Sequence, residues 1–385
     1  MSVSTLYDDL GLPSHLGERL TTYAAARVRD LCDGLGLPYQ TIIPEHWGIA
    51  YEPNYETKFG LGKPVDALLP EAILAEIPDC EVVGGFEVVL KDDVAGMDLL
   101  FRPGAERYYV PSPPWGPDRG DQTTVDIETS DGPSIESGIL LQSWFAPNYY
   151  HWALEHLTKL LLVQNVPPEI PLLVDRCSME HPPLRDMLAS LTGRSVIRLQ
   201  HRTKYAVGRL FFPSALCLPP MQMGWGSMMQ AGDICLQRLG VKYLRRHWSS
   251  QPPGKRRFFI HRTTGPMRLV NIAEVTQVFA EFGFEIVQPE YLSFAAQRKM
   301  FGGAQIIAGE TGAGLTNMLL APPSAKMICL QSQTWAGTPY ADMTASIGQE
   351  SIFVVGDLTS EDRGQHAPFS MDPVKLRSIL GGALS

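Results

Sequence analysis

Apolar residues in the second half of the chain alternate between short strand-like runs and helix-like segments. Runs such as RFFIHR at 257–262 and AQIIAG at 304–309 are each followed by a segment whose apolar positions have helical spacing. This alternation is typical of a parallel sheet with helices on its faces. We therefore expect residues 204–385 to form a Rossmann-like α/β domain, with a final helix over 371–384 that crosses back.

The preceding part of the chain shows the same alternation. A strand-like run at 137–145 and a second at 171–175 are separated by an apolar, helix-like segment, HWALEHLTKLLLV, at 151–163. Short β-branched and aromatic runs before them also indicate strands. These patterns predict a second Rossmann-like domain over residues 81–203.

Residues 1–80 fit neither domain by pattern. Helical spacing of apolar residues at 16–35 and 67–77 flanks a stretch rich in Pro, Gly and Tyr. We expect an N-terminal elaboration here. The fold predicted for the whole chain is α/β, with two Rossmann-like domains that face each other across a cleft.

Composition excludes several classes of partner and compartment. The 385 residues carry a formal net charge of −9, which argues against nucleic acid as a partner. The six cysteines are scattered without a C-x-x-C pair, which favours a reducing compartment. The N-terminus lacks the features of a signal peptide, and no apolar stretch approaches the roughly 20 residues that span a bilayer. We expect a cytoplasmic protein with at most peripheral membrane association.

The most distinctive local motif is the glycine-rich segment GETGAG at 309–314, between an apolar strand and a helix. Glycines let a ligand approach the backbone closely, and unpaired N–H groups at a helix start bind phosphate. A turn that serves only tight packing is the alternative. The order G-x-x-G-x-G differs from the dinucleotide motif, and no strand ending in an acidic residue follows at the expected spacing, which argues against a nicotinamide or flavin enzyme.

Two arginines precede this loop. Arg262 ends the strand at 257–262, and Arg268 follows shortly before a helix. Ligands of open α/β sheets bind beyond the carboxyl ends of strands, so we expect Arg262 to face the same crevice as the loop at 309–314. A guanidinium beside backbone amides could stabilise a diphosphate leaving group without a metal. An arginine that pairs with a surface carboxylate is the alternative.

His151 and Glu155 lie one helical turn apart in the segment NYYHWALE at 148–155. A histidine held by a carboxylate could take the proton of an acceptor hydroxyl, and Glu155 could also be the base itself. A structural histidine is the alternative. His151, Glu155 and His156 together match no zinc motif, so we expect no metal.

Four segments taken together resemble glycosyltransferase family 61. They occur in order over about 200 residues. They are NYYHWALEHLTKLLLV at 148–163, FFIHR at 258–262 with Arg268 and Asn271, LSFAAQRKMF at 292–301, and AGETGAGLTNMLLAPPSAKMICL at 308–330. The resemblance implies a GT-B architecture, an inverting reaction, a nucleotide-sugar donor such as a UDP-sugar, and no obligatory divalent metal or other cofactor. Bacterial members of the family are associated with capsule and surface polysaccharides.

The resemblance carries over by position His151, Trp152, Arg262 and residues 312–317, and the residue patterns above add the other candidates. Two are expected to be catalytic: His151 and Glu155. Residues expected to bind the donor nucleotide or its diphosphate are Arg262, Arg268, Glu310, Thr311, Gly312, Ala313, Gly314, Leu315, Thr316 and Asn317. Residues expected to support the acceptor side are Asn148, Tyr150 and Trp152.

The chain departs from the family pattern at two positions. The family usually has a histidine before Gly-Ala-Gly, where this chain has Thr311, and often a carboxylate where this chain has Cys329. The sequence thus predicts a metal-independent hexosyl- or pentosyltransferase that acts on a glycan or lipid-linked acceptor, with a homodimer left open. The alternatives are a non-catalytic sugar-nucleotide-binding or scaffolding protein and a cofactor-dependent sugar-nucleotide enzyme.

Overall fold

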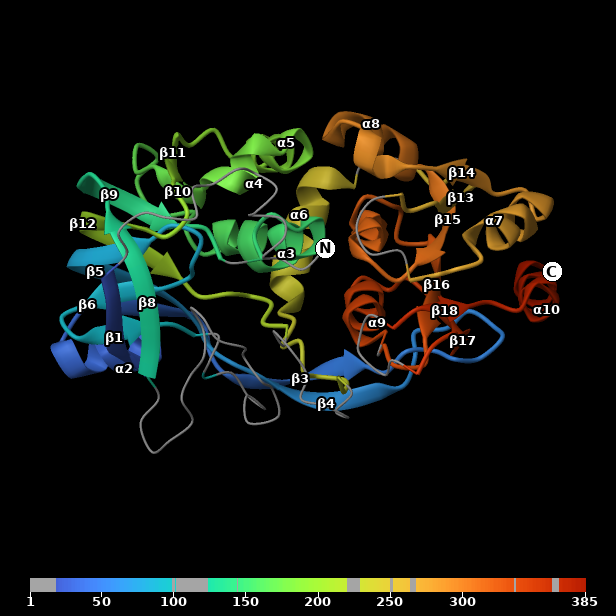
Figure 1. Ribbon diagram of the computed structural model, residues 1–385, viewed down its shortest axis with the longest axis horizontal. Helices are drawn as coiled ribbons and strands as arrows, with labels where there is room; N and C mark the ends of the chain where they lie inside the picture. Colours follow the sequence, from blue (N-terminus) through green and yellow to red (C-terminus); the bar gives the residue numbers. More distant parts are fainter. Residues whose placement is uncertain are drawn as a thin grey trace. The chain divides into compact units, whose positions relative to one another are not determined.

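The computed structural model describes residues 19–98, 101, 124–143, 145–219, 229–249, 252–263, 268–335, 337–361 and 367–385. The chain forms two compact units, which are coloured along the sequence in Figure 1. Unit 1 contains Met1–His46 and Leu69–Gly224, and unit 2 contains Trp47–Leu68 and Trp225–Ser385.

Unit 1 is built on a ten-stranded mixed sheet, in the order β11-β10-β9-β12-β8-β1-β7-β6-β5-β2, in which β12 also pairs with β5. Its strands are β1 (Arg19–Ala26), β2 (Tyr39–Ile43), β5 (Ala72–Val83), β6 (Val89–Lys91), β7 (Val94–Gly96), β8 (Thr124–Asp131), β9 (Ile135–Leu140), β10 (Leu172–Asp175), β11 (Val196–Leu199) and β12 (Thr203–Pro213). The β12–β5 pairing closes β12, β8, β1, β7, β6 and β5 into a ring. The strands β11, β10, β9 and β12 are parallel, so only this part of unit 1 is Rossmann-like.

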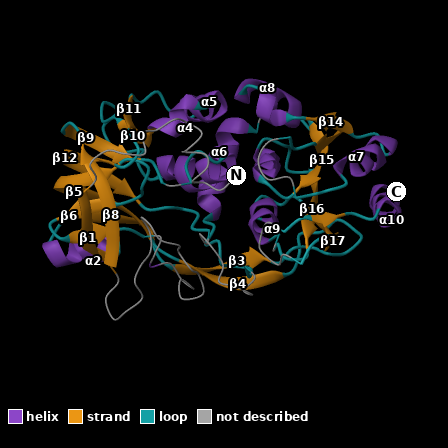
Figure 2. Ribbon diagram, viewed as in Figure 1, coloured by secondary structure: helices purple, strands orange, loops and turns teal. Residues whose placement is uncertain are grey.

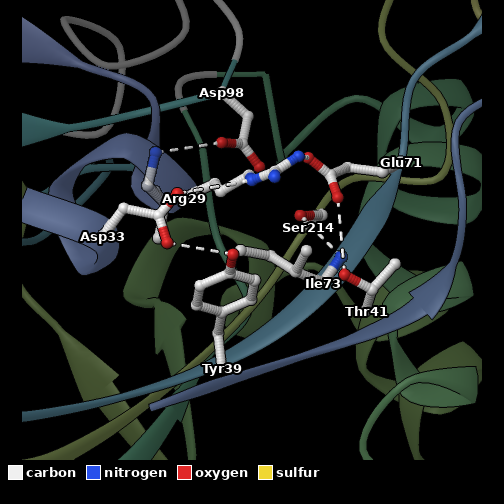
Figure 3. Close-up of polar contacts among 9 residues, drawn as sticks. Arg29, Asp33, Tyr39, Thr41, Glu71, Ile73, Asp98 and Ser214 are labelled. Atoms are coloured by element: carbon white, nitrogen blue, oxygen red, sulfur yellow. Dashed lines mark hydrogen bonds and ion pairs between the residues drawn. The ribbon is translucent and has the colours of Figure 1, made fainter. Parts of the chain in front are cut away.

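Most helical segments of unit 1 connect the parallel strands β9, β10 and β11 in chain order, and Figure 2 shows the helices in purple beside the strands. They are α2 (Val28–Leu35), α3 (Tyr149–His151), the π-helix η3 (Trp152–His156), the 3-10 helix η4 (Leu157–Leu161), α4 (Arg176–Glu180) and α5 (Pro182–Ala189). Polar contacts fix α2 against the sheet, as Figure 3 shows: Arg29 pairs with Glu71, and Asp98 accepts a hydrogen bond from the N–H of Val28 at 3.3 Å. The helix α2 is therefore part of the structure of unit 1.

Unit 2 contains a doubly wound sheet in the order β14-β13-β15-β16-β17-β18, which is parallel except for β18. The strands are β13 (Arg256–Ile260), β14 (Glu285–Val287), β15 (Ala304–Glu310), β16 (Lys326–Ser332), β17 (Ser351–Leu358) and β18 (Phe369–Ser370). A separate two-stranded sheet joins β3 (His46–Tyr51) to β4 (Pro64–Leu69). The chain reverses direction across the sheet between β13 and β15, and such a switch point is where ligands of these folds bind.

Helices cover both faces of the unit 2 sheet. They are α6 (Arg238–Trp248), α7 (Ile272–Glu281), η5 (Pro289–Tyr291), α8 (Phe294–Phe301), η6 (Ala313–Leu319), α9 (Thr338–Ala345) and α10 (Pro373–Leu384). Apolar residues of α7 and α10 pack with Phe259 in one core. On the other face Phe258 meets Phe301 of α8 edge-on, with ring centroids 5.5 Å apart. Successive residues of β13 thus serve opposite cores, as expected for a strand buried on both sides.

The structure corrects the predicted division of the chain. The described residues 19–80 form no separate elaboration, because β1, β2 and much of β5 belong to the unit 1 sheet, α2 lies in unit 1, and Trp47–Leu68 belongs to unit 2. The predicted boundary at 203/204 falls at the start of β12, which lies wholly in unit 1. The antiparallel strands of unit 1 are also outside the predicted Rossmann-like pattern.

Several predicted elements differ in kind. The helix expected at 67–77 is the end of β4 and the first half of β5, and the first half of the helix expected at 16–35 is β1. The final helix is confirmed as α10, but it packs on α7 in the core of unit 2. All six cysteines are buried and form no disulfide bonds. In the described ranges, no helix has both the length and the apolar character needed to cross a membrane.

Candidate functional site

The first candidate site lies at the switch point of unit 2. Arg262 follows β13 by two residues, and Gly312 follows β15 by two residues; the two strands are paired in register, with Ile260 opposite Gly309. A Cβ placed on Gly312 would lie 3.1 Å from Nη1 of Arg262. The guanidinium therefore lies directly against the glycine-rich loop, as the sequence predicted.

A buried ion pair forms the floor of this site. Nε of Arg268 lies 3.1 Å from Oε1 of Glu310, and the Arg268 guanidinium also donates to the carbonyl oxygen of Thr311. The same guanidinium lies over the ring of Trp335, 4.9 Å from its centroid. Burial lowers the pKa of Arg268, opposed by Glu310 and assisted by the charge of Arg262. The charges of Arg268 and Glu310 compensate each other, so we assign this pair to positioning the loop. Arg262 is the arginine that lies at the surface of the loop.

The glycine loop does not continue into the predicted α-helix. Residues Ala313–Leu319 form the 3-10 helix η6, whose dipole is smaller than that of a longer α-helix. Residues Gly312, Ala313 and Gly314 are partly exposed, while Leu315, Thr316 and Asn317 are buried. The Asn317 amide donates to the carbonyl of Gly314 at 3.0 Å. Leu315, Thr316 and Asn317 therefore support the loop from the protein interior. The groups placed to donate hydrogen bonds to an anion are the loop backbone and the side chain of Arg262.

The second candidate site is the His151–Glu155 pair of unit 1. Nδ1 of His151 is hydrogen-bonded to Oε1 of Glu155, and the histidine side chain is 22% exposed against 9% for the carboxylate. A carboxylate accepts the Nδ1 proton, which leaves Nε2 as the basic nitrogen of a neutral ring. The ring stacks on Phe145, with centroids 4.8 Å apart and planes inclined by 22°. The structure thus brings together the two residues predicted to be base and orienter.

The three predicted supporting residues hold this helix start in place. The Asn148 side chain caps α3 by accepting a hydrogen bond from the N–H of Tyr150 at 2.9 Å. Tyr150 is buried and meets the His151 ring edge-on. Trp152 is fully buried and donates from Nε1 to the carbonyl of Leu184. These residues set the position of His151, and Trp152 lies too deep to touch a substrate.

A buried ion pair, which the sequence analysis missed, lies beside the histidine pair. Nζ of Lys159 is 2.8 Å from Oε2 of Glu87, and the lysine side chain is 1% exposed. Burial raises the pKa of Glu87 to about 7, against the effect of Lys159, and the negative charge of Glu155 acts in the same direction as burial. The signal was a lysine inside the apolar run at 157–163, but its partner could not be identified from the sequence.

His156 is excluded as a base by its surroundings. Its Nε2 lies 2.9 Å from Oγ of Ser143, and the side chain is wholly buried. Burial lowers its pKa well below the usual value, and the charges of Lys159 and His151 act in the same direction. Across the part of the chain that the structure describes, no group of three His, Cys, Asp or Glu side chains could hold a metal ion.

A comparison with protein families gives one finding for this segment. Residues 149–328 match the family model described as Glycosyltransferase 61. The match agrees with the resemblance of the four sequence motifs and supports a relation to glycosyltransferase family 61. No individual curated protein matches the chain. The matched segment includes His151, Glu155, Arg262 and the loop at 309–314, so both candidate sites lie within it.

The two departures from the family pattern are structural neighbours. Thr311 directly follows β15 and Cys329 lies in β16, and the N–H of Thr311 donates to the carbonyl of Leu330 at 2.8 Å. Both side chains are buried. Burial raises the pKa of the Cys329 thiol to about 12, so it stays neutral. The expected histidine and carboxylate are thus replaced together by two small neutral side chains.

Proposed function

We propose that this protein is an inverting glycosyltransferase that transfers a sugar from a nucleotide-sugar, most simply a UDP-sugar, to a hydroxyl group of a glycan or lipid-linked acceptor. The transfer needs no divalent metal. The proposal includes a GT-B arrangement and a cytoplasmic role in capsule or surface polysaccharide synthesis. The family match and the two candidate sites support it.

The observation that carries the proposal is the placement of Arg262 against Gly312 at the switch point of unit 2. A diphosphate at this point would meet a guanidinium and the backbone of the partly exposed residues 312–314 together. The buried ion pair of Arg268 and Glu310 supports the loop, and within that pair the two charges compensate each other. These features suit a leaving group that gains negative charge during the reaction.

In the proposed reaction, Nε2 of His151 takes the proton of the acceptor hydroxyl while Glu155 holds the ring and stabilises its positive charge. The acceptor oxygen forms a bond to the anomeric carbon, and the bond from that carbon to the donor's phosphate oxygen breaks. The electron pair leaves with the nucleoside diphosphate, whose charge Arg262 and the loop amides stabilise. Attack opposite to the leaving group inverts the configuration at the anomeric carbon.

Thermal unfolding in the presence of UDP-, GDP-, CMP- and TDP-sugars tests the donor half of the proposal, with NAD and divalent metals as controls. At a donor concentration 100 times its dissociation constant, binding stabilises the folded state by about 2.7 kcal/mol. We expect one nucleotide class to raise the unfolding midpoint in the presence of a chelator, and the effect to be lost in Arg262→Ala. A response to NAD alone would contradict the proposal.

A second candidate function is a non-catalytic sugar-nucleotide-binding or scaffolding protein. The joint replacement at Thr311 and Cys329 favours it, because two ionisable groups of the family pattern are missing at one place. Nucleotide binding without sugar transfer or donor hydrolysis would support this alternative. Release of the nucleoside diphosphate that depends on His151 would exclude it.

A further inference from the structure

A polar and aromatic cluster lies directly beside the proposed diphosphate site, at the carboxyl ends of β13 and β14. Thr263 is the residue after Arg262, and its N–H and Oγ1 both donate to Oε1 of Glu290, at 3.1 and 2.8 Å. Its Oγ1 also lies 3.2 Å from the hydroxyl of Tyr291. Glu290 and Tyr291 belong to η5, which follows β14. Three side chains from two adjacent strand ends therefore meet on one edge of the sheet.

Among the described residues, only one of the two carboxylate oxygens of Glu290 accepts hydrogen bonds. Both hydrogen bonds from Thr263 end on Oε1, and no described residue donates to Oε2. The carboxylate is only partly buried, so a ligand can reach it. A carboxylate oxygen beside a phosphate site is well suited to accept hydrogen bonds from the two vicinal hydroxyls of a ribose.

Tyr291 presents an aromatic ring to solvent. Its side chain is 67% exposed, although its hydroxyl is fixed by Thr263. A ring that is held at one end and open on its face can stack on a planar base, and stacking tolerates any base. Because the residue is oriented before a ligand arrives, little rotamer entropy is lost on binding.

The direction in which a nucleotide would extend follows from burial. On the β15 and β16 side of Arg262 the neighbouring side chains of Arg268, Glu310 and Thr311 are buried. On the β14 side, Thr263 and Tyr291 are exposed. Arg262 and Glu290's partner Thr263 are adjacent in the chain, with Cα atoms about 3.8 Å apart, so a ligand on Arg262 lies next to the Thr263–Glu290 contact.

We infer that Glu290 and Tyr291 form the nucleoside subsite of unit 2, in which Glu290 binds the ribose hydroxyls and Tyr291 stacks on the base of a ribonucleoside diphosphate. This inference rests on the proposed function, since it assumes that the diphosphate binds at Arg262. Thr263 connects the two residues to the strand that carries that arginine.

Calorimetric titration with UDP, 2′-deoxy-UDP and inorganic pyrophosphate, repeated with GDP, tests the inference. Tyr291→Ala should weaken UDP binding about tenfold or more, and Tyr291→Phe, which keeps the ring, should change it by less than about threefold. Glu290→Gln, which keeps an acceptor oxygen for Thr263, should weaken UDP about tenfold and abolish the preference for UDP over 2′-deoxy-UDP. Pyrophosphate binding should stay unchanged in all three variants.

Trp47→Ala provides the control, since Trp47 is 72% exposed in β3 and has no place in either site. If the wild-type protein binds UDP and both Tyr291→Ala and Glu290→Gln bind it with the same affinity, the inference is wrong, while the proposed function still stands. An equal loss of affinity for UDP and for pyrophosphate would indicate local distortion of the site and would also overturn the inference. If neither UDP, GDP nor pyrophosphate binds the wild-type protein, both the inference and the proposed function fail.

Discussion

The two candidate sites are built in opposite ways. The site in unit 2 combines Arg262, Arg268 and the loop at 309–314, which are distant in sequence and are brought together by parallel strand pairing. The His151–Glu155 pair of unit 1 lies within a single turn of an irregular helix in which α, π and 3-10 geometry follow one another. Binding at the first site therefore depends on the sheet, while the chemistry of the second depends on one local segment and its support.

Each site also has its own buried ion pair, and the two differ in function. Arg268 and Glu310 lie inside the unit 2 site and fix the loop that would contact a ligand. Glu87 and Lys159 lie beneath the unit 1 helix, where the pair joins η4 to the segment that precedes β6. Short π-helical segments are often found at functional sites, and the ion pair anchors η4, which directly follows the π segment η3. The comparison predicts that mutations at the two sites separate binding from turnover.

The largest expected effect is on turnover at His151. His151→Ala removes the proposed base, so the rate of sugar transfer should fall by about 10² to 10⁴ while the donor dissociation constant stays unchanged. Initial rates of nucleoside diphosphate release and calorimetric titration measure the two quantities. His46→Ala, at an exposed histidine in β3, is the matched control. Undiminished transfer by His151→Ala would remove this residue from the mechanism.

The next effect is on stability at Lys159. Lys159→Met leaves Glu87 buried without its partner, which should lower the free energy of unfolding by about 3 kcal/mol. Burial raises the pKa of Glu87 from 4.5 to about 7, so its contribution to stability is complete below pH 4.5 and is lost as the pH rises through 7. Without Lys159 that pKa rises further, so the loss should be greater at pH 8 than at pH 5.

Chemical denaturation of Lys159→Met at these two pH values measures the effect. The double variant Lys159→Met with Glu87→Gln should recover much of the lost stability, because it buries no charge. A loss that is equal at both pH values, or that the double variant does not reverse, would show that Glu87 is not the group left uncompensated.

A smaller effect is expected on donor binding at Arg262. Arg262→Ala should raise the dissociation constant of the nucleoside diphosphate about 10- to 100-fold, since charged hydrogen bonds contribute about 1.5 to 3 kcal/mol each. Arg262→Lys keeps the charge but loses the planar guanidinium group, so its dissociation constant should lie between those of the wild type and Arg262→Ala. Arg256→Ala, which removes an exposed arginine paired with Glu285, serves as control. Equal affinity in Arg262→Ala and Arg256→Ala would rule out the assigned binding site.

The smallest effect is expected at the glycine loop. In Gly312→Ala the new methyl group would lie 3.1 Å from Nη1 of Arg262, so the guanidinium must shift and binding should weaken about tenfold. Gly314→Ala is the matched control, because its methyl group would meet Ile260 at 3.2 Å and not the arginine. Titration of both variants with UDP measures the difference. If Gly314→Ala is the more damaging of the two, the loop acts through packing alone.

The site in unit 2 could be predicted because its signals are local. The apolar strands, the glycines at 309–314 and the strand-end position of Arg262 can each be recognised in a short window of sequence. The rule that ligands bind beyond the carboxyl ends of parallel strands then brings them together. The geometry of η6 could not be predicted in this way, because the choice between an α and a 3-10 helix depends on packing.

Unit 1 was harder to predict because its strands pair over long distances. β1 pairs with β8, and β5 pairs with β12; in both pairs the partner residues are a hundred or more positions apart in sequence. The apolar residues at 16–35 and 67–77 have helical spacing, but much of these segments forms strands. Pairing with a distant strand lets the extended conformation bury the apolar residues, and this tertiary context outweighs the local pattern. Lys159 stood out as a charge in an apolar run, but only the fold shows that Glu87 lies opposite.

Parallel calorimetric titration of wild-type protein, His151→Ala and Arg262→Ala with the donor sugar nucleotide that stabilises the wild type, in the presence of a chelator, separates donor binding from chemistry. We expect wild-type affinity in His151→Ala and an affinity about 10- to 100-fold weaker in Arg262→Ala. A similar loss in both variants, or a loss confined to His151→Ala, would contradict the assignment of donor binding to unit 2 and chemistry to unit 1.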